Sequence, residues 1–257
     1  MGWHSWWHAV VAFIAAFAAG VANAIAGGGT NISFPTLLWL GLSPVDANAT
    51  SAVALWPGYA SASWGFWKEI KASPHRWYWL AIPSLVGGGI GAYLLVHTPS
   101  TIFRSIAPFL VIGSSALIAA EPALAKRLGT HGDGRRSRGW LVLAIAVQLV
   151  IATYGGYFGA GLGILILTAL GLLGLSDIHK ANGMKSIYSV AIKGVAVVYF
   201  IVASKVVWHA AIVMAVGAVA GGYVGAAVGR KVKEHAMRWV VVGIGVVMGI
   251  VMLVRIM

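Results

Sequence analysis

Two glycine-rich stretches hold the residues whose types and spacing best fit ligand binding. In the first, three consecutive glycines precede Thr-Asn-Ile-Ser and separate a long apolar segment, 6–25, from a short one, 30–41. The first amides of a helix lack intrahelical acceptors, and the positive end of the helix dipole favours an anion. We therefore expect the amides of residues 30–33 to be free donors for a ligand. The candidate binding residues are Gly27, Gly28, Gly29, Thr30, Asn31 and Ser33.

The second stretch, GGYFGAGLG at 155–163, precedes another short apolar segment, 162–174. Its candidate binding residues, by the same argument, are Gly159, Gly161 and Gly163. Two helix N-termini that point at a common centre would bind an anion without requiring a cation. The alternative is that these glycines only let helices pack closely, as small residues do in membranes. The shortness of both following segments favours a site.

Polar residues also gather where two later apolar segments begin. They are Asn48, Thr50 and Ser51 in the first half of the chain, and Asn182, Lys185 and Ser186 in the second. Such side chains either cap the helix N-terminus or contact a substrate, and both interpretations stay open. Lys185 is either a charge that fixes membrane topology or a cation that attracts anions to the mouth of a pathway.

Lys193 lies well inside the apolar segment 184–204. A cation within a membrane is costly unless it faces a cavity or a partner, which makes it a candidate functional residue. All six Asp and Glu residues lie in loops or at segment ends, so none is expected at the depth of Lys193. An unpaired lysine suits a negative substrate, and the missing carboxylates disfavour a cation pathway. The alternative is that the lysine extends to the membrane surface.

The composition indicates an integral membrane protein. Of 257 residues, 60% are hydrophobic and 9% charged, whereas soluble domains carry about 25% charged residues. The absence of cysteine excludes disulfides and thiolate metal sites. We find no catalytic arrangement, metal-ligand motif or nucleotide-binding pattern, so we predict no enzyme activity, no metal and no cofactor. The expected partners are the lipid bilayer and a small anion.

The net charge of +12 has a topological explanation that does not involve nucleic acid. Fourteen of the 18 Lys and Arg residues fall in loops on one face of the expected bundle, and three fall on the other. Basic loops stay on the cytoplasmic side. This bias predicts a multi-pass inner-membrane protein with both termini outside and a cytoplasmic linker at 121–138.

The apolar segments predict an all-α polytopic membrane protein. Eight are long enough to span the bilayer, and the segments 30–41 and 162–174 are short, broken or re-entrant. The long segments are 6–25, 47–67, 77–97, 101–120, 139–158, 184–204, 207–229 and 237–256.

The two halves of the chain repeat. Ala47-Asn48 recurs 134 residues later as Ala181-Asn182, and Arg104 recurs as Arg238 at the same offset. Gly87-Gly88 likewise recurs as Gly221-Gly222, where we expect close helix packing. Each copy holds an odd number of segments, so the second enters the membrane inverted, a pattern typical of secondary transporters. The predicted units are a first repeat at 1–120, the linker at 121–138 and a second repeat at 139–257.

These motifs resemble the sulfite exporter TauE/SafE family of membrane permeases. The strings are AGGG-x5-P up to Pro35, GLSP-x2-A-x-ATS at 41–51, GGYFGAGLG at 155–163, and GLS-x4-AN-x3-S ending at Ser186. The resemblance implies a permease for small anions: sulfite, sulfonates and, in some members, small carboxylates. Lys185 lies where the family often has a Gly-Thr-Ser-like string, which points to an altered substrate preference.

We therefore expect a secondary transporter that exports sulfite or an organosulfonate by alternating access between two inverted halves. An anion channel and a permease for small carboxylates such as lactate are the alternatives. Coupling to protons or other ions, the direction of flux and assembly as a homodimer stay open.

Overall fold

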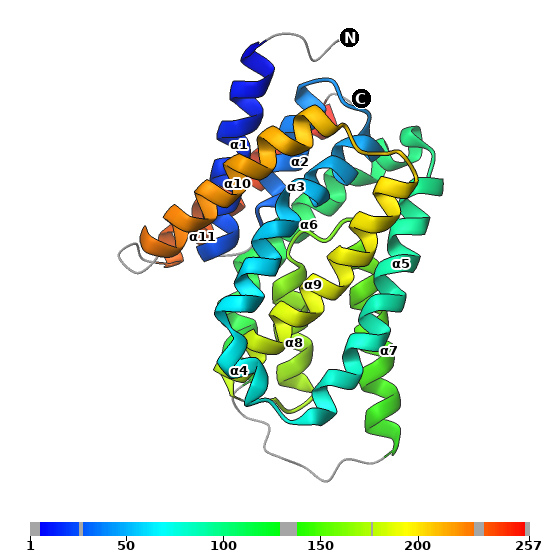
Figure 1. Ribbon diagram of the computed structural model, residues 1–257, viewed down its shortest axis with the longest axis vertical. Helices are drawn as coiled ribbons and strands as arrows, with labels where there is room; N and C mark the ends of the chain where they lie inside the picture. Colours follow the sequence, from blue (N-terminus) through cyan, green and yellow to red (C-terminus); the bar gives the residue numbers. More distant parts are fainter. Residues whose placement is uncertain (1–5, 26–27, 129–137, 176, 229–233, 255–257) are drawn as a thin grey trace.

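The structure, a computed structural model, describes residues 6–25, 28–128, 138–175, 177–228 and 234–254. Every regular element in these ranges is helical, which confirms the all-α prediction (Figure 1). The long helices are α1 (Trp6–Ile25), α3 (Pro44–Gly65), α5 (Ala81–His97), α6 (Ser100–Leu128), α7 (Arg138–Tyr157), α9 (Ile178–Val202), α10 (Trp208–Val228) and α11 (Glu234–Val254). The shorter ones are α2 (Thr30–Trp39), α4 (Trp67–Lys71), the 3-10 helix η1 (His75–Leu80) and α8 (Leu162–Leu172).

Six helical stretches are long and apolar enough to cross a membrane, where the sequence predicted eight. They are Trp6–Ala24, His75–His97, Ser100–Ala120, Gly139–Tyr157, Ile178–Val202 and Trp208–Gly225. Of the other two expected spans, α3 carries Asp46, Asn48 and Thr50 in its first turns, and these polar residues lower its hydropathy. The apolar part of α11, Arg238–Val254, is too short for the same criterion. The two short helices α2 and α8 occur where the glycine breaks predict them.

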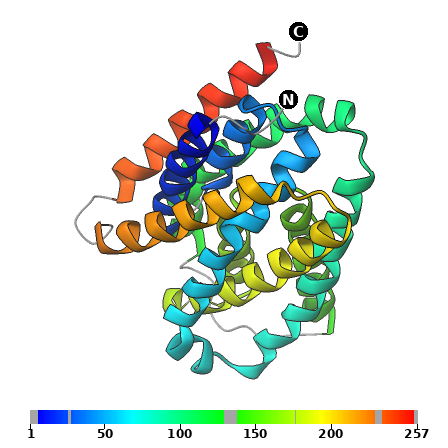
Figure 2. The same ribbon diagram turned by 45° about the horizontal axis from the view of Figure 1, so that its top comes forward.

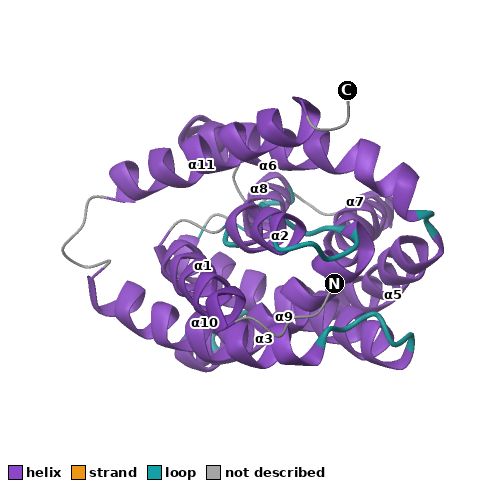
Figure 3. Ribbon diagram, turned by 90° about the horizontal axis from the view of Figure 1, so that it is seen from above, coloured by secondary structure: helices purple, strands orange, loops and turns teal. Residues whose placement is uncertain are grey.

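The two short helices lie in the middle of the bundle. Seen from above, α2 and α8 are surrounded by the long helices (Figure 3). α2 contacts α1, α3, α6 and α11, and α8 contacts α6, α7 and α9. Many large apolar side chains on the outer helices are exposed, among them Phe109, Val142, Val150 and Val216. Such a surface suits contact with lipid.

The helices pack in the same pattern when the first half is exchanged for the second. α1 packs on α10 as α7 packs on α5, and α3 crosses α10 as α9 crosses α5 (Figure 2). The contact of α2 with α11 has its counterpart in the contact of α8 with α6. The pairs α3–α9 and α6–α11 each join a helix to its own equivalent. The two halves therefore interleave.

Glycines bring two of these helix pairs into backbone contact. A methyl group at Gly221 of α10 would overlap the Phe17 carbonyl oxygen of α1, and one at Gly91 of α5 would overlap the Thr153 carbonyl oxygen of α7. A methyl group at Gly87 would come within 2.6 Å of the Ala152 methyl carbon. The close packing expected for the glycines inside long segments is confirmed at Gly87, Gly88 and Gly221, but not at Gly222, where a methyl group would meet nothing within 4 Å.

Candidate functional site

The first break forms a tight turn before α2. Gly28 has φ of +103°, a conformation that side chains other than glycine rarely adopt, and the Gly29 amide donates to Asn23 Oδ1 at 2.8 Å. Gly27 lies outside the described residues. Gly28, Gly29, Thr30, Asn31 and Ser33 are all buried.

The expectation of free amides at residues 31–33 is wrong. The Asn31 amide donates to the Gly28 carbonyl at 2.9 Å, and the next two amides both donate to the Gly29 carbonyl at 3.0 Å. The turn at the break continues directly into the helix, so the glycine carbonyls serve as the acceptors for the first helical turn. These amides are therefore not available to a ligand, so side chains must supply the hydrogen-bond donors of a binding site here.

The Asn31 side chain is the centre of a buried polar cluster. Ser114 Oγ donates to Asn31 Oδ1 at 2.8 Å, and Asn31 Nδ2 donates to Ser115 Oγ at 3.2 Å. A methyl group at Gly245 of α11 would overlap Ser115 Oγ. Ser114 and Ser115 were not among the predicted site residues, although two adjacent serines inside an apolar segment are a recognisable signal for such a cluster.

The second break carries the buried lysine. Gly159 and Gly161 have φ of +77° and +70°. Lys193 Nζ donates to the Phe158 carbonyl at 3.1 Å, and a methyl group at Gly159 would overlap this ammonium group. Lys193 is only 3% exposed, so its side chain does not extend to the membrane surface. No ion pair with Lys193 occurs in the part of the chain that the structure describes.

The structure brings the two breaks together on α6. Ser114, which binds Asn31 of the first break, has its backbone oxygen 3.7 Å from where a methyl group on Gly161 of the second break would lie. The rings of Phe34 and Phe158 also meet edge to face, with their centroids 5.3 Å apart. The two breaks therefore lie close together beside α6, and their joint role in binding an anion stays a prediction.

The polar residues near the start of α3 point into the protein and do not cap the helix. α3 begins at Pro44, and Ser43 Oγ accepts from the Asp46 amide, so capping as the role of the later residues is wrong. The contacts of these later residues are Asn48 Nδ2 with the Tyr157 carbonyl (2.9 Å), Thr50 Oγ1 with the Val207 amide (3.0 Å) and Ser51 Oγ with Ser33 Oγ (2.6 Å). Asn48 Oδ1 is buried without a hydrogen-bond partner in the described chain.

The corresponding residues of α9 also lie inside their helix. α9 begins at Ile178 and is capped by Asp177, which accepts from the His179 and Lys180 amides; the Lys180 bond is the main cause that lowers the pKa of Asp177. The capping interpretation is therefore wrong here too. The remaining contacts are Asn182 Nδ2 with the Ile178 carbonyl (3.0 Å), Ser186 Oγ with the Asn182 carbonyl (3.0 Å) and Lys185 Nζ with Asn182 Oδ1 (2.8 Å).

Lys185 lies beside the second short helix. The position of a methyl group on Gly163, in the first turn of α8, is 3.4 Å from Lys185 Cδ. Two lysines of α9 therefore flank the second break, Lys193 at Gly159 and Lys185 at Gly163. Of the polar candidates on α9, these two contact the break, whereas Asn182 and Ser186 bond within their own helix.

The described residues contain no group of three or more His, Cys, Asp or Glu side chains that could hold a metal.

The sequence is similar to a known family of membrane proteins. The sequence model described as "Sulfite exporter TauE/SafE" matches residues 12–252. A "Probable membrane transporter protein" of Haemophilus influenzae is 27% identical over 217 residues, which cover 84% of this chain and 83% of the relative. "Probable membrane transporter protein YfcA" of Escherichia coli K12 is 28% identical over 238 residues, which cover 93% and 87%. No solved structure matches the chain.

Proposed function

Because the chain belongs to the sulfite exporter TauE/SafE family of membrane transporters, we propose that it is a secondary transporter that exports small sulfur-containing anions such as sulfite or organosulfonates. The family match covers nearly the whole chain, including both breaks and both polar helix starts. The direction of transport rests on the family likeness, and the inner-membrane location with both termini outside rests on the distribution of basic residues.

The burial of Lys193 is the observation that carries this proposal. Its ammonium group has three N–H donors, and the structure describes one hydrogen bond, to the Phe158 carbonyl. A buried cation without a counter-ion is destabilising, and a bound anion would supply both the charge and the missing acceptors. Asn48 donates a hydrogen bond to the neighbouring Tyr157 carbonyl, and we place it at the same site as the polar group from the first half of the chain.

The interleaved halves support transport by alternating access between two inverted repeats. A methyl group on Gly28 would lie against Ile118 of α6 and Val241 of α11, whereas one on Gly161 would lie against Leu117 and Ser114 of α6. The contacts with the equivalent helices α11 and α6 are at different heights. At the repeat offset of 134 residues, Ser114 corresponds to Met248, seven residues beyond Val241. Seven helical residues span about 10 Å. If the two glycines exchanged these contact heights, the protein would change from a conformation open to one side of the membrane to one open to the other, as alternating access requires.

Flux measurements on the purified chain in proteoliposomes test the proposal. A carrier should give saturable uptake of radiolabelled sulfite that accelerates when unlabelled sulfite is present on the opposite side. Single-channel currents would identify an anion channel instead. Absence of sulfite and organosulfonate flux from a monodisperse protein would reject the proposed substrate class.

A further inference from the structure

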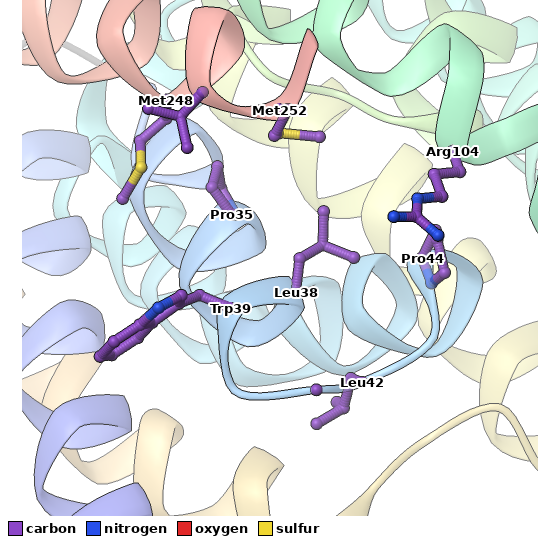
Figure 4. Close-up of a pocket in the computed structure, with 10 residues that line it drawn as sticks. Pro35, Leu38, Trp39, Leu42, Pro44, Arg104, Met248 and Met252 are labelled. Atoms are coloured by element: carbon purple, nitrogen blue, oxygen red, sulfur yellow. The ribbon is translucent and has the colours of Figure 1, made fainter. Parts of the chain in front are cut away.

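A cavity of about 580 Å³ lies where the end of α2 meets the start of α6 and the last turns of α11 (Figure 4). Its lining includes Pro35, Leu38, Pro44, Arg104, Met248 and Met252. It is at the end of the bundle that carries the short loops 40–43 and 98–99, the face predicted to be outside. It is distinct from the site at Lys193, which none of these residues contacts in the described structure.

The cavity combines apolar walls with a single cation. Leu38, Met248 and Met252 form much of its wall, while Arg104 reaches from α6 along one edge toward Pro44 (Figure 4). Arg104 is exposed, and no hydrogen bond or ion pair engages its side chain within the described ranges. A monoanion with an apolar body fits such a surface, because the guanidinium group can bind the charged end while the hydrocarbon leaves water.

The inner end of the cavity is adjacent to the buried polar cluster. Pro35 follows Asn31 by one helical turn, and Met248 follows Gly245 by one turn. Gly245 itself contacts Ser115 and lies close to Asn31 Nδ2. The Asn31 cluster therefore lies about one helical turn from the innermost lining residues.

The equivalent arginine in the second half of the chain differs in its exposure to solvent. Arg238 corresponds to Arg104 at the repeat offset, yet it is only 8% exposed. The structure thus offers an accessible arginine at one end of the bundle and a buried one in the equivalent position. The exposure of only one of these two arginines supports a vestibule on one side of the protein.

We propose that this cavity is a vestibule site in which Arg104 binds the charged end of an organic monoanion and the apolar walls bind its hydrocarbon body. The inference rests on the proposed transport function and sharpens it, because such a vestibule selects sulfonates with a carbon chain over bare sulfite. A membrane lipid is the competing occupant. Arg104 favours an anion, because a lipid acyl chain in the cavity would leave the guanidinium group without a negative partner.

Binding of an alkanesulfonate series to the full chain in lipid nanodiscs tests the site. Each methylene removed from water should tighten binding by up to about fourfold, so 1-butanesulfonate should bind at least about tenfold more tightly than methanesulfonate. Arg104→Ala should weaken both ligands by a similar factor of about ten or more. Met252→Ser should flatten the chain-length dependence, with a larger loss of affinity for 1-butanesulfonate than for methanesulfonate. Arg104→Lys should retain part of the affinity, because it keeps the charge.

Lys205→Ala is the matched control, since Lys205 is a cation of the same predicted face that does not line the cavity. An affinity that does not change with chain length would overturn the vestibule proposal, and so would equal affinities for Arg104→Ala and Lys205→Ala. If the affinity does not change with chain length and phospholipid co-purifies with the protein, the cavity would be assigned to lipid. Sulfite flux measured in parallel separates the two proposals. Wild-type flux with a flat series rejects only the vestibule, whereas a steep series without any sulfonate or sulfite flux rejects only the transporter.

Discussion

Asn48 and Lys193 donate hydrogen bonds to successive carbonyls, those of Tyr157 and Phe158, at 2.9 and 3.1 Å. Asn48 comes from α3 in the first half of the chain and Lys193 from α9 in the second. The last carbonyls of a helix carry partial negative charge and lack intrahelical donors. The end of α7 is therefore held by one side chain from each half, and a movement of either helix would alter the surroundings of the Lys193 ammonium.

Replacing Lys193 with Met should abolish most anion flux without loss of stability. Methionine keeps the length of the side chain and removes a buried charge, a change that is often neutral or stabilising. We expect flux in proteoliposomes to fall at least about tenfold while the thermal unfolding midpoint stays equal or rises. If Lys193 only stabilised the fold, the midpoint would fall together with flux. Lys205→Met on the surface is the control and should change neither.

Replacing Gly159 with Ala should disturb the lysine site beyond the cost of backbone strain. The new methyl group would overlap the Lys193 ammonium, and an alanine at φ of +77° also costs about 1–2 kcal/mol. Gly174→Ala provides the control, because Gly174 has φ of +93° and follows the end of α8 that is farther from Gly159. Both variants should lose similar backbone stability, but only Gly159→Ala should lose sulfite flux. Equal flux in the two variants would contradict a functional contact between Gly159 and Lys193.

Replacing Gly221 with Ala should weaken the contact between α1 and α10. Its methyl group would overlap the Phe17 carbonyl oxygen, and such overpacking costs about 1–3 kcal/mol. At the neighbouring Gly222, a methyl group would meet nothing within 4 Å, so Gly222→Ala should be neutral or gain up to about 1 kcal/mol of helix propensity. Thermal unfolding in detergent compares the two. A Gly221→Ala protein as stable as Gly222→Ala would show that the backbone contact is not needed.

Single cysteines can establish the orientation, because the natural chain contains none. Ser100→Cys lies on the face with few basic residues, and Ala72→Cys lies beside Lys71 on the basic face; both positions are exposed. We expect an impermeant maleimide to label Ser100→Cys in intact cells and Ala72→Cys only after lysis, since basic loops stay cytoplasmic. Labelling of both positions from outside would contradict the predicted topology.

The sequence predicted the elements better than their contacts. The breaks at Gly28 and Gly159 were predictable because each glycine-rich stretch precedes an apolar segment too short to span the bilayer. Glycines alone do not stop a helix here, since Gly87 and Gly88 lie inside α5. The helix starts were misjudged by three residues at Pro44 and by six at Ile178, because Ser43 and Asp177 begin their helices earlier. Asn48 and its neighbours consequently lie inside a helix, so capping cannot be their role.

The partners of the site residues depend on tertiary approach, which no local pattern contains. Asn31 meets Ser114 and Ser115 across more than 80 positions of the chain. The depth of Lys193 was predicted from its place in an apolar segment, but its acceptor, the Phe158 carbonyl, follows only from how α7 ends against α9. The roles of the candidate residues in binding stay predictions until the variants above are measured.

The glycine contacts of α1 with α10 and of α7 with α5 make the two copies mutually dependent. Each copy supplies the small-residue groove that receives the leading helix of the other. A fragment that carried one copy alone would leave that groove exposed, so we expect it to need a second copy, which the predicted topology would insert in the opposite orientation. Fusion of both copies into a single polypeptide removes that requirement, and it frees the two grooves and the two leading helices to diverge, which is how one copy could acquire a buried lysine that the other lacks.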